Sequence, residues 1–103
     1  MTILNVSESS FATMTKRGVC VVKFGAKWCG PCKAIEPKLE AASANLPGVK
    51  ILGVDIDECP RLVQSMTLRK VPTIVVMKAG VEVARKEGMA SESDLLAMVQ
   101  DHL

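Results

Sequence analysis

The sequence predicts a single α/β domain, and three observations support that prediction. The chain has 103 residues, 49% of them hydrophobic and 23% charged, which suits one compact domain with one core. The stretch 19–24 is almost continuously apolar, like a strand buried on both faces of a parallel sheet, and 49–55 is a second apolar strand. Strand-like and helix-like segments follow in the order β, α, β, α, β, α, β, β, α. We therefore expect residues 1–103 to form one domain.

The first half of the chain predicts three strands and two helices. A short strand at 3–5 precedes a short helix, for which Ser7 is the expected cap. Between the two apolar strands, residues 33–46 are rich in Ala, Lys, Glu and Leu and predict a helix. Pro37 lies inside that helix and should kink it. Pro47-Gly48 should end it.

The second half predicts a helix, a hairpin and a final helix. An acidic turn follows the strand 49–55, and 60–66 has the pattern of one or two helical turns. The strands 73–77 and 81–86 flank Ala79-Gly80, which supplies a tight hairpin turn. A capping pattern at Ser91 opens the last helix. Its apolar residues should share one face: Leu95, Leu96, Val99 and Leu103.

Composition argues against several classes of function. The net charge of +2 comes from 13 basic and 11 acidic residues without a basic block, and only three aromatic residues are available to stack on bases, so we expect no nucleic acid partner. No apolar stretch approaches the roughly 20 residues needed to cross a bilayer, so we expect no membrane partner. Residues 1–5 lack a basic segment followed by an apolar one, as a secretory signal has. We expect a cytoplasmic protein.

The segment Trp28-Cys29-Gly30-Pro31-Cys32 lies where the strand 19–24 gives way to a helix. Two intervening residues keep the sulfurs close enough to form a small disulfide ring, and a helix start beneath them favours thiolate. One sulfur can attack a foreign disulfide and the other can release it. A structural zinc site uses the same spacing but needs four ligands. The remaining candidates, without a second paired spacing, are Cys20, Cys59 and His102.

Further features at fixed positions extend this pattern along the chain. They are Lys33 after the second cysteine, Pro37, Asp57, Val71-Pro72-Thr73, Gly80 and Gly88. Over nearly its whole length the chain resembles the thioredoxin family. The resemblance implies a thioredoxin fold, with a central mixed sheet of five strands flanked by four helices and a redox site at the end of the second strand. It also implies a cis peptide bond before Pro72, lying against the cysteines.

The resemblance assigns roles to the residues of the site. Cys29 would be the exposed nucleophile that forms a mixed disulfide with a client protein, and Cys32 would then attack Cys29 and free the reduced client. Gly30 and Pro31 would shape the turn. The proline at 72 removes an N–H and would leave a backbone edge to which an extended client can pair. The apolar docking surface would be formed by Trp28, Val71, Pro72, Gly88 and Met89.

The resemblance also implies partners. The leading interpretation is a protein-disulfide reductase that binds no cofactor and is recycled by thioredoxin reductase, with NADPH used indirectly. Nothing in the chain looks like a dinucleotide-binding glycine motif. We expect a monomer that acts on disulfide-containing clients. Two alternatives are a dithiol oxidase or isomerase, usually associated in the family with His in place of Pro31, and a binding module whose partners sense its redox state.

Lys23 departs from the family pattern. Thioredoxins usually carry a buried Asp at this position, often partnered by a Lys on the third strand, where this chain has Gly53. A charged Lys23 would stabilise the thiolates and make the protein a stronger oxidant. A neutral Lys23 would accept the proton of Cys32. In a third interpretation its head bends to solvent and only its methylenes pack.

Four other residues have simpler expected roles. Cys20 lies inside the apolar strand and should be a small buried hydrophobe. Cys59, beside the acidic turn, should be more exposed, with a structural or incidental role, and oxidation is the regulatory alternative. His102 should be solvated. Asp57 would either cap the helix 60–66 or serve the site.

Overall fold

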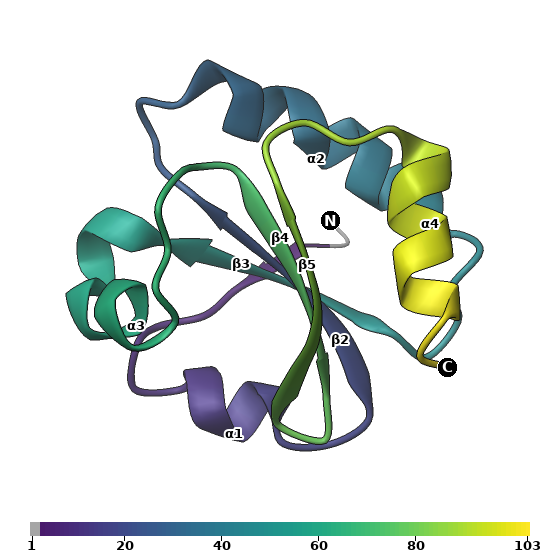
Figure 1. Ribbon diagram of the computed structural model, residues 1–103, viewed down its shortest axis with the longest axis horizontal. Coiled ribbons are helices and arrows are strands. Elements are labelled where there is room, and N and C mark those ends of the chain that lie inside the picture. Colours follow the sequence, from purple (N-terminus) through teal and green to yellow (C-terminus); the bar gives the residue numbers. More distant parts are fainter. Residues whose placement is uncertain (1–2) are drawn as a thin grey trace.

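A five-stranded sheet in the order β1-β3-β2-β4-β5 forms the centre of the molecule (Figure 1). This computed structural model describes residues 3–103, so Met1 and Thr2, where the sequence was inspected for a signal, lie outside the described residues. The elements are β1 (Ile3–Asn5), α1 (Phe11–Thr15), β2 (Val19–Gly25), α2 (Gly30–Ser43), β3 (Lys50–Asp55), the 3-10 helix η1 (Ile56–Glu58), α3 (Pro60–Ser65), β4 (Thr73–Lys78), β5 (Val81–Glu87) and α4 (Glu92–Gln100). Strands β1, β3 and β2 are parallel, whereas β4 and β5 run antiparallel to their neighbours. The predicted mixed sheet with four flanking helices is confirmed.

Side chains of β2 alternate between two cores, one on each face of the sheet. Val21 packs with Ile35 and Leu95 on the face that α2 and α4 cover. Phe24 packs with Phe11 on the opposite face, which α1 and α3 cover (Figure 1). All five side chains are 7% exposed or less. Both faces of β2 are buried, as its apolar sequence predicts.

Helix α1 begins later than expected. Its first residue is Phe11, and Ser10 stands at the N-cap position without a capping side-chain hydrogen bond. The expectation that Ser7 caps this helix is wrong. The backbone N–H of Ser7 donates to Ser10 Oγ at 3.0 Å, and the N–H of Ser10 donates to the carbonyl of Ser7 at 3.2 Å. These serines therefore bond one another in a turn ahead of the helix.

Helix α2 begins at Gly30 and ends at Ser43, earlier at both ends than the expected range 33–46. Pro37 lies inside it, as expected. The sequence expectation started the helix after the second cysteine, whereas that cysteine itself lies in the first turn. This shift places the whole dithiol segment at the helix N-terminus.

The β4–β5 hairpin has the predicted tight turn. Lys78 pairs with Val81, which leaves a two-residue loop of Ala79 and Gly80. Both loop residues have positive φ angles, 51° and 81°, as the common two-residue hairpin turn requires. A register irregularity lies between Val76 and Met77.

Helix α4 has the predicted cap. Ser91 Oγ accepts a hydrogen bond from the backbone N–H of Asp94 at 3.1 Å. Leu95 and Val99 are each 1% exposed and pack against the sheet. The expectation for Leu103 is wrong: it is 65% exposed, because the helix ends before it.

The segment before β4 carries the cis peptide bond between Val71 and Pro72 that the resemblance implied. The backbone N–H of Gly88 donates to the carbonyl of Pro72 at 2.8 Å, which joins this segment to the end of β5.

Among residues 3–103, no helix combines the length and the apolar character needed to cross a membrane.

Candidate active site

Cys29 and Cys32 lie at the N-terminus of α2 and are joined by a disulfide, with their Cα atoms 5.3 Å apart. Cys29 is the N-cap residue, and its Sγ accepts a hydrogen bond from the backbone N–H of Cys32 at 3.2 Å. The partial positive charge of a helix N-terminus and a donor N–H both favour negative charge on sulfur. The geometry therefore suits a reversible dithiol whose first sulfur is the better thiolate.

The two cysteines differ in exposure. Cys29 is 5% exposed and Cys32 is 1% exposed. Cys29 is less accessible than the expected exposed nucleophile, because Ala26 and the half-buried Val71 pack against the pair. An attacking group from outside meets Cys29 first.

The turn residues differ in what they contribute. Pro31 lies in the first turn of α2, where its missing N–H costs no helical hydrogen bond. A Cβ added at Gly30 would meet no atom within 4 Å, so the protein's own packing does not require glycine there.

Trp28 and Asp57 are brought together from different segments. The indole Nε1 donates to Asp57 Oδ2 at 2.9 Å, and Trp28 is 68% exposed beside the disulfide. The alternative that Asp57 caps α3 is wrong. The N-terminal amides of that helix, from Arg61 and Leu62, donate instead to Glu8 Oε1 at 2.6 and 3.1 Å. No sequence pattern indicates the role of Glu8, because it lies more than 50 residues before its partners.

The remaining residues expected at the docking surface differ in exposure, and of these Val71 packs against the two cysteines. Met89 is 42% exposed, Val71 and Gly88 are half-buried, and Pro72 is buried. Among residues 3–103, no backbone hydrogen bond uses the N–H or the carbonyl of Val71. The backbone edge beside the disulfide is thus Val71, since the carbonyl of Pro72 is already bonded.

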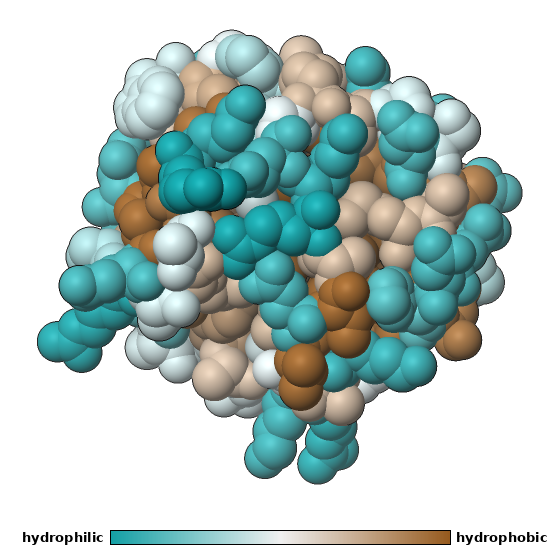
Figure 2. Space-filling view, viewed as in Figure 1, coloured by the Kyte–Doolittle hydropathy of each residue, from teal (hydrophilic) through white to brown (hydrophobic). Residues whose placement is uncertain are grey.

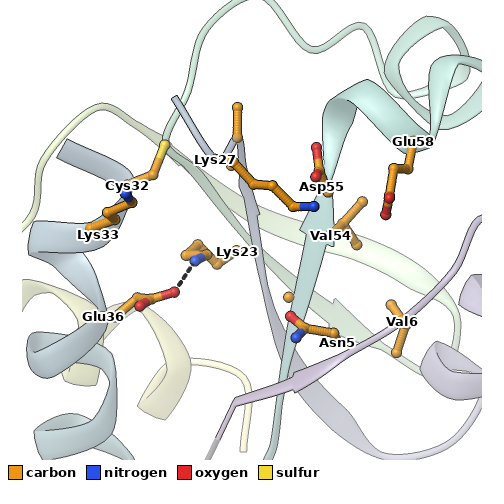
Figure 3. A pocket seen from close by; sticks show the side chains of 13 residues that line it. Asn5, Val6, Lys23, Lys27, Cys32, Lys33, Glu36, Val54, Asp55 and Glu58 are labelled. Atoms are coloured by element: carbon orange, nitrogen blue, oxygen red, sulfur yellow. Dashed lines mark hydrogen bonds and ion pairs between the residues drawn. The ribbon is translucent and has the colours of Figure 1, made fainter. Parts of the chain in front are cut away.

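Lys23 forms an ion pair that the sequence analysis missed. Its ammonium binds the carboxylate of Glu36 on α2 (Figure 3), and the two side chains are 12% and 38% exposed. The interpretation in which Lys23 bends into solvent is therefore wrong. A signal for Glu36 was present, because it follows Cys32 by four residues and so shares its face of the helix.

An open cavity of about 520 Å³ lies beside Cys32, between β2, β3 and α2 (Figure 3).

Lys23 is paired in register with Gly53 of β3. A Cβ on Gly53 would stand 2.8 Å from Asn5 Oδ1, so a side chain there would require Asn5 to move. The counter-charge of Lys23 therefore comes from the helix and not from the neighbouring strand.

The other two cysteines are free and buried. Cys20 is 0% exposed and Cys59 is 1% exposed, so the expectation that Cys59 is more exposed is wrong. Its side chain packs in the core beneath α3, with Phe24 and Val54. Burial raises the pKa of both thiols, and the carboxylates of Glu8, Glu58 and Asp55 raise that of Cys59 further. Within residues 3–103, no group of three or more Cys, His, Asp or Glu side chains is placed to hold a metal ion.

Comparisons with known proteins agree with this geometry. The thioredoxin family model matches residues 2–101. A thioredoxin of Chlamydia trachomatis serovar D is 40% identical over 97 residues, covering 94% of this chain and 95% of its own length. A thioredoxin of Staphylococcus saprophyticus is 36% identical over the full length of both chains. The solved structure of a mutant thioredoxin from Halobacterium salinarum is similar, with a TM-score of 0.88 and 28% identity over 97% of this chain and 89% of that one.

Thioredoxins carry their redox group as a protein disulfide and need no bound cofactor. They act with reductases and with disulfide-bearing client proteins. This chain has the disulfide at the expected place, at the start of α2 beside the cis peptide bond. The chain therefore belongs to the thioredoxin family and is a protein thiol-disulfide oxidoreductase.

Proposed function

We propose that this protein reduces disulfides of client proteins, with Cys29 as the attacking thiolate and Cys32 as the resolving thiol. The observation that carries the assignment is the asymmetry of the pair. Cys29 caps the helix, accepts an N–H and is the more accessible sulfur, whereas Cys32 is 1% exposed. A thiolate attacks best when it is both stabilised and reachable.

The reaction has two exchanges. Cys29 Sγ attacks one sulfur of the client disulfide, so a Cys29–client disulfide forms and the second client sulfur leaves as a thiolate. Cys32 Sγ, once deprotonated, attacks Cys29 Sγ and forms the protein disulfide, and the first client sulfur leaves. Two electrons thus pass to the client. We propose that a thioredoxin reductase returns them from NADPH.

We further propose that clients bind a docking surface formed by Trp28, Val71, Pro72, Gly88 and Met89. Trp28, which precedes Cys29, and Met89 are exposed apolar groups, and the unbonded backbone of Val71 can pair with an extended client segment. The absence of a side chain at Gly30 supports the same proposal. A Cβ there would meet no protein atom within 4 Å and would project into the space through which a client approaches.

We propose that residues 1–103 act as one monomeric domain in the cytoplasm. Hydrophilic side chains are interspersed with apolar ones over the face in Figure 2. The exposed large hydrophobic residues of the described chain are Leu4, Trp28, Val81, Met89 and Leu103, and the proposed docking surface for clients already includes Trp28 and Met89. A stable dimer requires a larger continuous apolar surface than single residues provide. Size-exclusion chromatography with light scattering measures the mass directly.

The function is tested by trapping. With insulin as the disulfide substrate, we expect Cys29→Ser and Cys32→Ser each to abolish turnover. Only Cys32→Ser should leave a covalent protein–substrate disulfide that mass spectrometry detects. Cys59→Ala, which removes a buried thiol outside the site, is the control and should retain turnover. Trapping by Cys29→Ser instead would reverse the two roles, and full turnover by either serine variant would exclude the dithiol mechanism.

A further inference from the structure

The side chain of Lys23 shares a small space with the resolving cysteine. Lys23 Cε and Cys32 Sγ lie 3.5 and 3.3 Å from the same point, the position that a Cβ on Gly25 would occupy. Because Gly25 has no side chain, that space is left between the lysine stem and the sulfur. Lys23 and Cys32 also line the same cavity (Figure 3).

The ammonium of Lys23 is held on this side of the sheet. Glu36 binds it from α2, and the position opposite it on β3 is Gly53, which carries no side chain and so supplies no counter-charge. The side chain of Lys23 is 12% exposed, and its ion pair with Glu36 keeps the ammonium on the side of the sheet where Cys32 lies.

Other charges face the same cavity from every element around it. The full set is Lys23, Lys27, Lys33, Glu36, Asp55 and Glu58. Among these groups the described residues form one ion pair, between Lys23 and Glu36. Figure 3 places Asp55 and Glu58 across the cavity from that pair.

We propose that Lys23 is a fixed cation that favours the thiolate of Cys32 when the client is released, and that Glu36 is the positioning residue that holds its ammonium there. This inference rests on the proposed function, in which Cys32 resolves the mixed disulfide. A cation near a sulfur favours the thiolate over the thiol.

In the step concerned, the thiol proton of Cys32 passes to solvent and the sulfur becomes a thiolate. Its electron pair forms the bond to Cys29 Sγ, the bond between Cys29 and the client breaks, and the client sulfur leaves as a thiolate that takes up a proton. Lys23 stays protonated throughout and exchanges nothing. Its positive charge lowers the free energy of the thiolate that must form first.

The first measurement is the equilibrium between the Cys29/Cys32 disulfide and a glutathione redox buffer. A cation that stabilises the thiolate favours the reduced form only at a pH where Cys32 is ionised. Measured above the midpoint of Cys32 ionisation, Lys23→Met should therefore shift the equilibrium toward the disulfide. We expect a shift of about tenfold, equal to about 30 mV for this two-electron couple. Lys23→Arg keeps the charge and should stay near the native value.

Glu36 is tested through its dependence on Lys23. Glu36→Gln should shift the equilibrium in the same direction as Lys23→Met but less, because the ammonium is no longer held. The double variant should match Lys23→Met alone. Additive shifts, or a shift by Glu36→Gln in the opposite direction, would show that Glu36 acts as an independent charge and would overturn its positioning role.

The second measurement is the pH dependence of client release from the trapped mixed disulfide, followed in a single turnover. Lys23→Met should move the midpoint of that profile to higher pH by about one unit, which corresponds to the same tenfold change. A purely structural role for Lys23 would alter stability and leave both this midpoint and the glutathione equilibrium unchanged.

Matched controls lie on the same helix away from the cavity. Lys38→Met and Glu40→Gln make the same changes of charge at an exposed and a half-buried position, and neither should shift the equilibrium. If the native protein fails to reduce a disulfide substrate, the proposed function is wrong. If the native protein is active but Lys23→Met leaves both measurements unchanged, only this inference is wrong.

Discussion

Two of the four cysteines are held inside the protein as neutral thiols. Cys20 and Cys59 are almost completely buried, and burial raises the pKa of both above the usual value of 9.0. Neither thiol is exposed to a client or an oxidant. The four cysteines therefore divide into a reactive pair and two core thiols, because their surroundings differ.

This difference predicts how stability depends on pH. The folded state binds the protons of these two thiols more tightly than the unfolded chain does. Their contribution to the free energy of unfolding is therefore complete below pH 9.0, the usual pKa, and is lost as the pH rises through the raised pKa values of the folded state. We expect the free energy of unfolding of the oxidised protein to fall above pH 9.0. Urea denaturation at several pH values measures it. Cys20→Ala/Cys59→Ala should show a shallower fall, and an equal slope would contradict the assignment.

At the residue scale, the sequence predicted those site residues whose signal is local. The motif from Trp28 to Cys32 is contiguous, so its place at the start of a helix could be inferred. Glu36 and Glu8 were missed because their partners lie on other elements, and their pairing depends on how α2 and α1 pack on the sheet. Lys23 was noticed as unusual, but its partner could not be named without the fold.

At the scale of elements, the start of α4 depends on one side-chain hydrogen bond. In α4 the hydroxyl of Ser91 satisfies the N–H of Asp94, and the helix then presents Leu95 and Val99 to the core. This helix packs beside α2, whose N-terminus carries the disulfide (Figure 1). The cap of one helix thus supports the position of another.

Removing that cap should destabilise the protein measurably. Ser91→Ala leaves the amide of Asp94 without its acceptor, and we expect a loss of about 1 kcal/mol in the free energy of unfolding. Urea denaturation followed by circular dichroism measures it. Ser93→Ala, in the first turn of the helix, removes a hydroxyl that bonds only Ser91 Oγ, at 3.1 Å, and leaves the cap bond to Asp94, so it should change the free energy by less than about 0.5 kcal/mol. Equal effects of the two variants would show that the cap contributes nothing specific.

The sequence predicted the type and order of every major element, because apolar strands and amphipathic helices have distinct periods. Its errors lie at the ends. The serines before α1 offered several equivalent caps, and the choice among Ser7 and Ser10 is made by their hydrogen bonds to one another. Leu103 matched the helical period of α4, yet the helix stops before reaching it.

At the scale of the whole molecule, Arg85 joins the edge strand β5 to the segment that precedes Pro72. Its guanidinium donates to the carbonyls of Met66 and Thr67 at 2.7 and 3.2 Å and forms an ion pair with Glu82. That segment continues into Val71, beside the disulfide. A residue of the sheet edge therefore helps to fix one wall of the site.

We expect Arg85→Gln to loosen that wall. Two carbonyls lose a charged donor, which should lower the free energy of unfolding by about 1 kcal/mol. Amide hydrogen exchange in residues 66–72 should accelerate more than in β2. Lys86→Gln, at the exposed neighbouring position, should leave exchange in that segment unchanged. Uniform acceleration over the whole chain would indicate global destabilisation and contradict a local role.

The overall arrangement could be inferred only in part. The order of elements along the chain was readable, but the strand order β1-β3-β2-β4-β5 depends on long-range pairing that no local pattern encodes. The resemblance supplied the mixed sheet and the cis bond before Pro72. The burial of Cys59 was missed because it depends on α3 folding back over the sheet.

The contact between Trp28 and Asp57 has one more consequence. This is the only tryptophan in a chain without tyrosine, so the near-ultraviolet emission of the protein comes from one indole, anchored by a 2.9 Å hydrogen bond next to Cys29. A disulfide beside an indole quenches its emission, and a dithiol does so far less. We therefore expect reduction of the Cys29–Cys32 disulfide to brighten the emission of this single indole, so that turnover can be followed without any label.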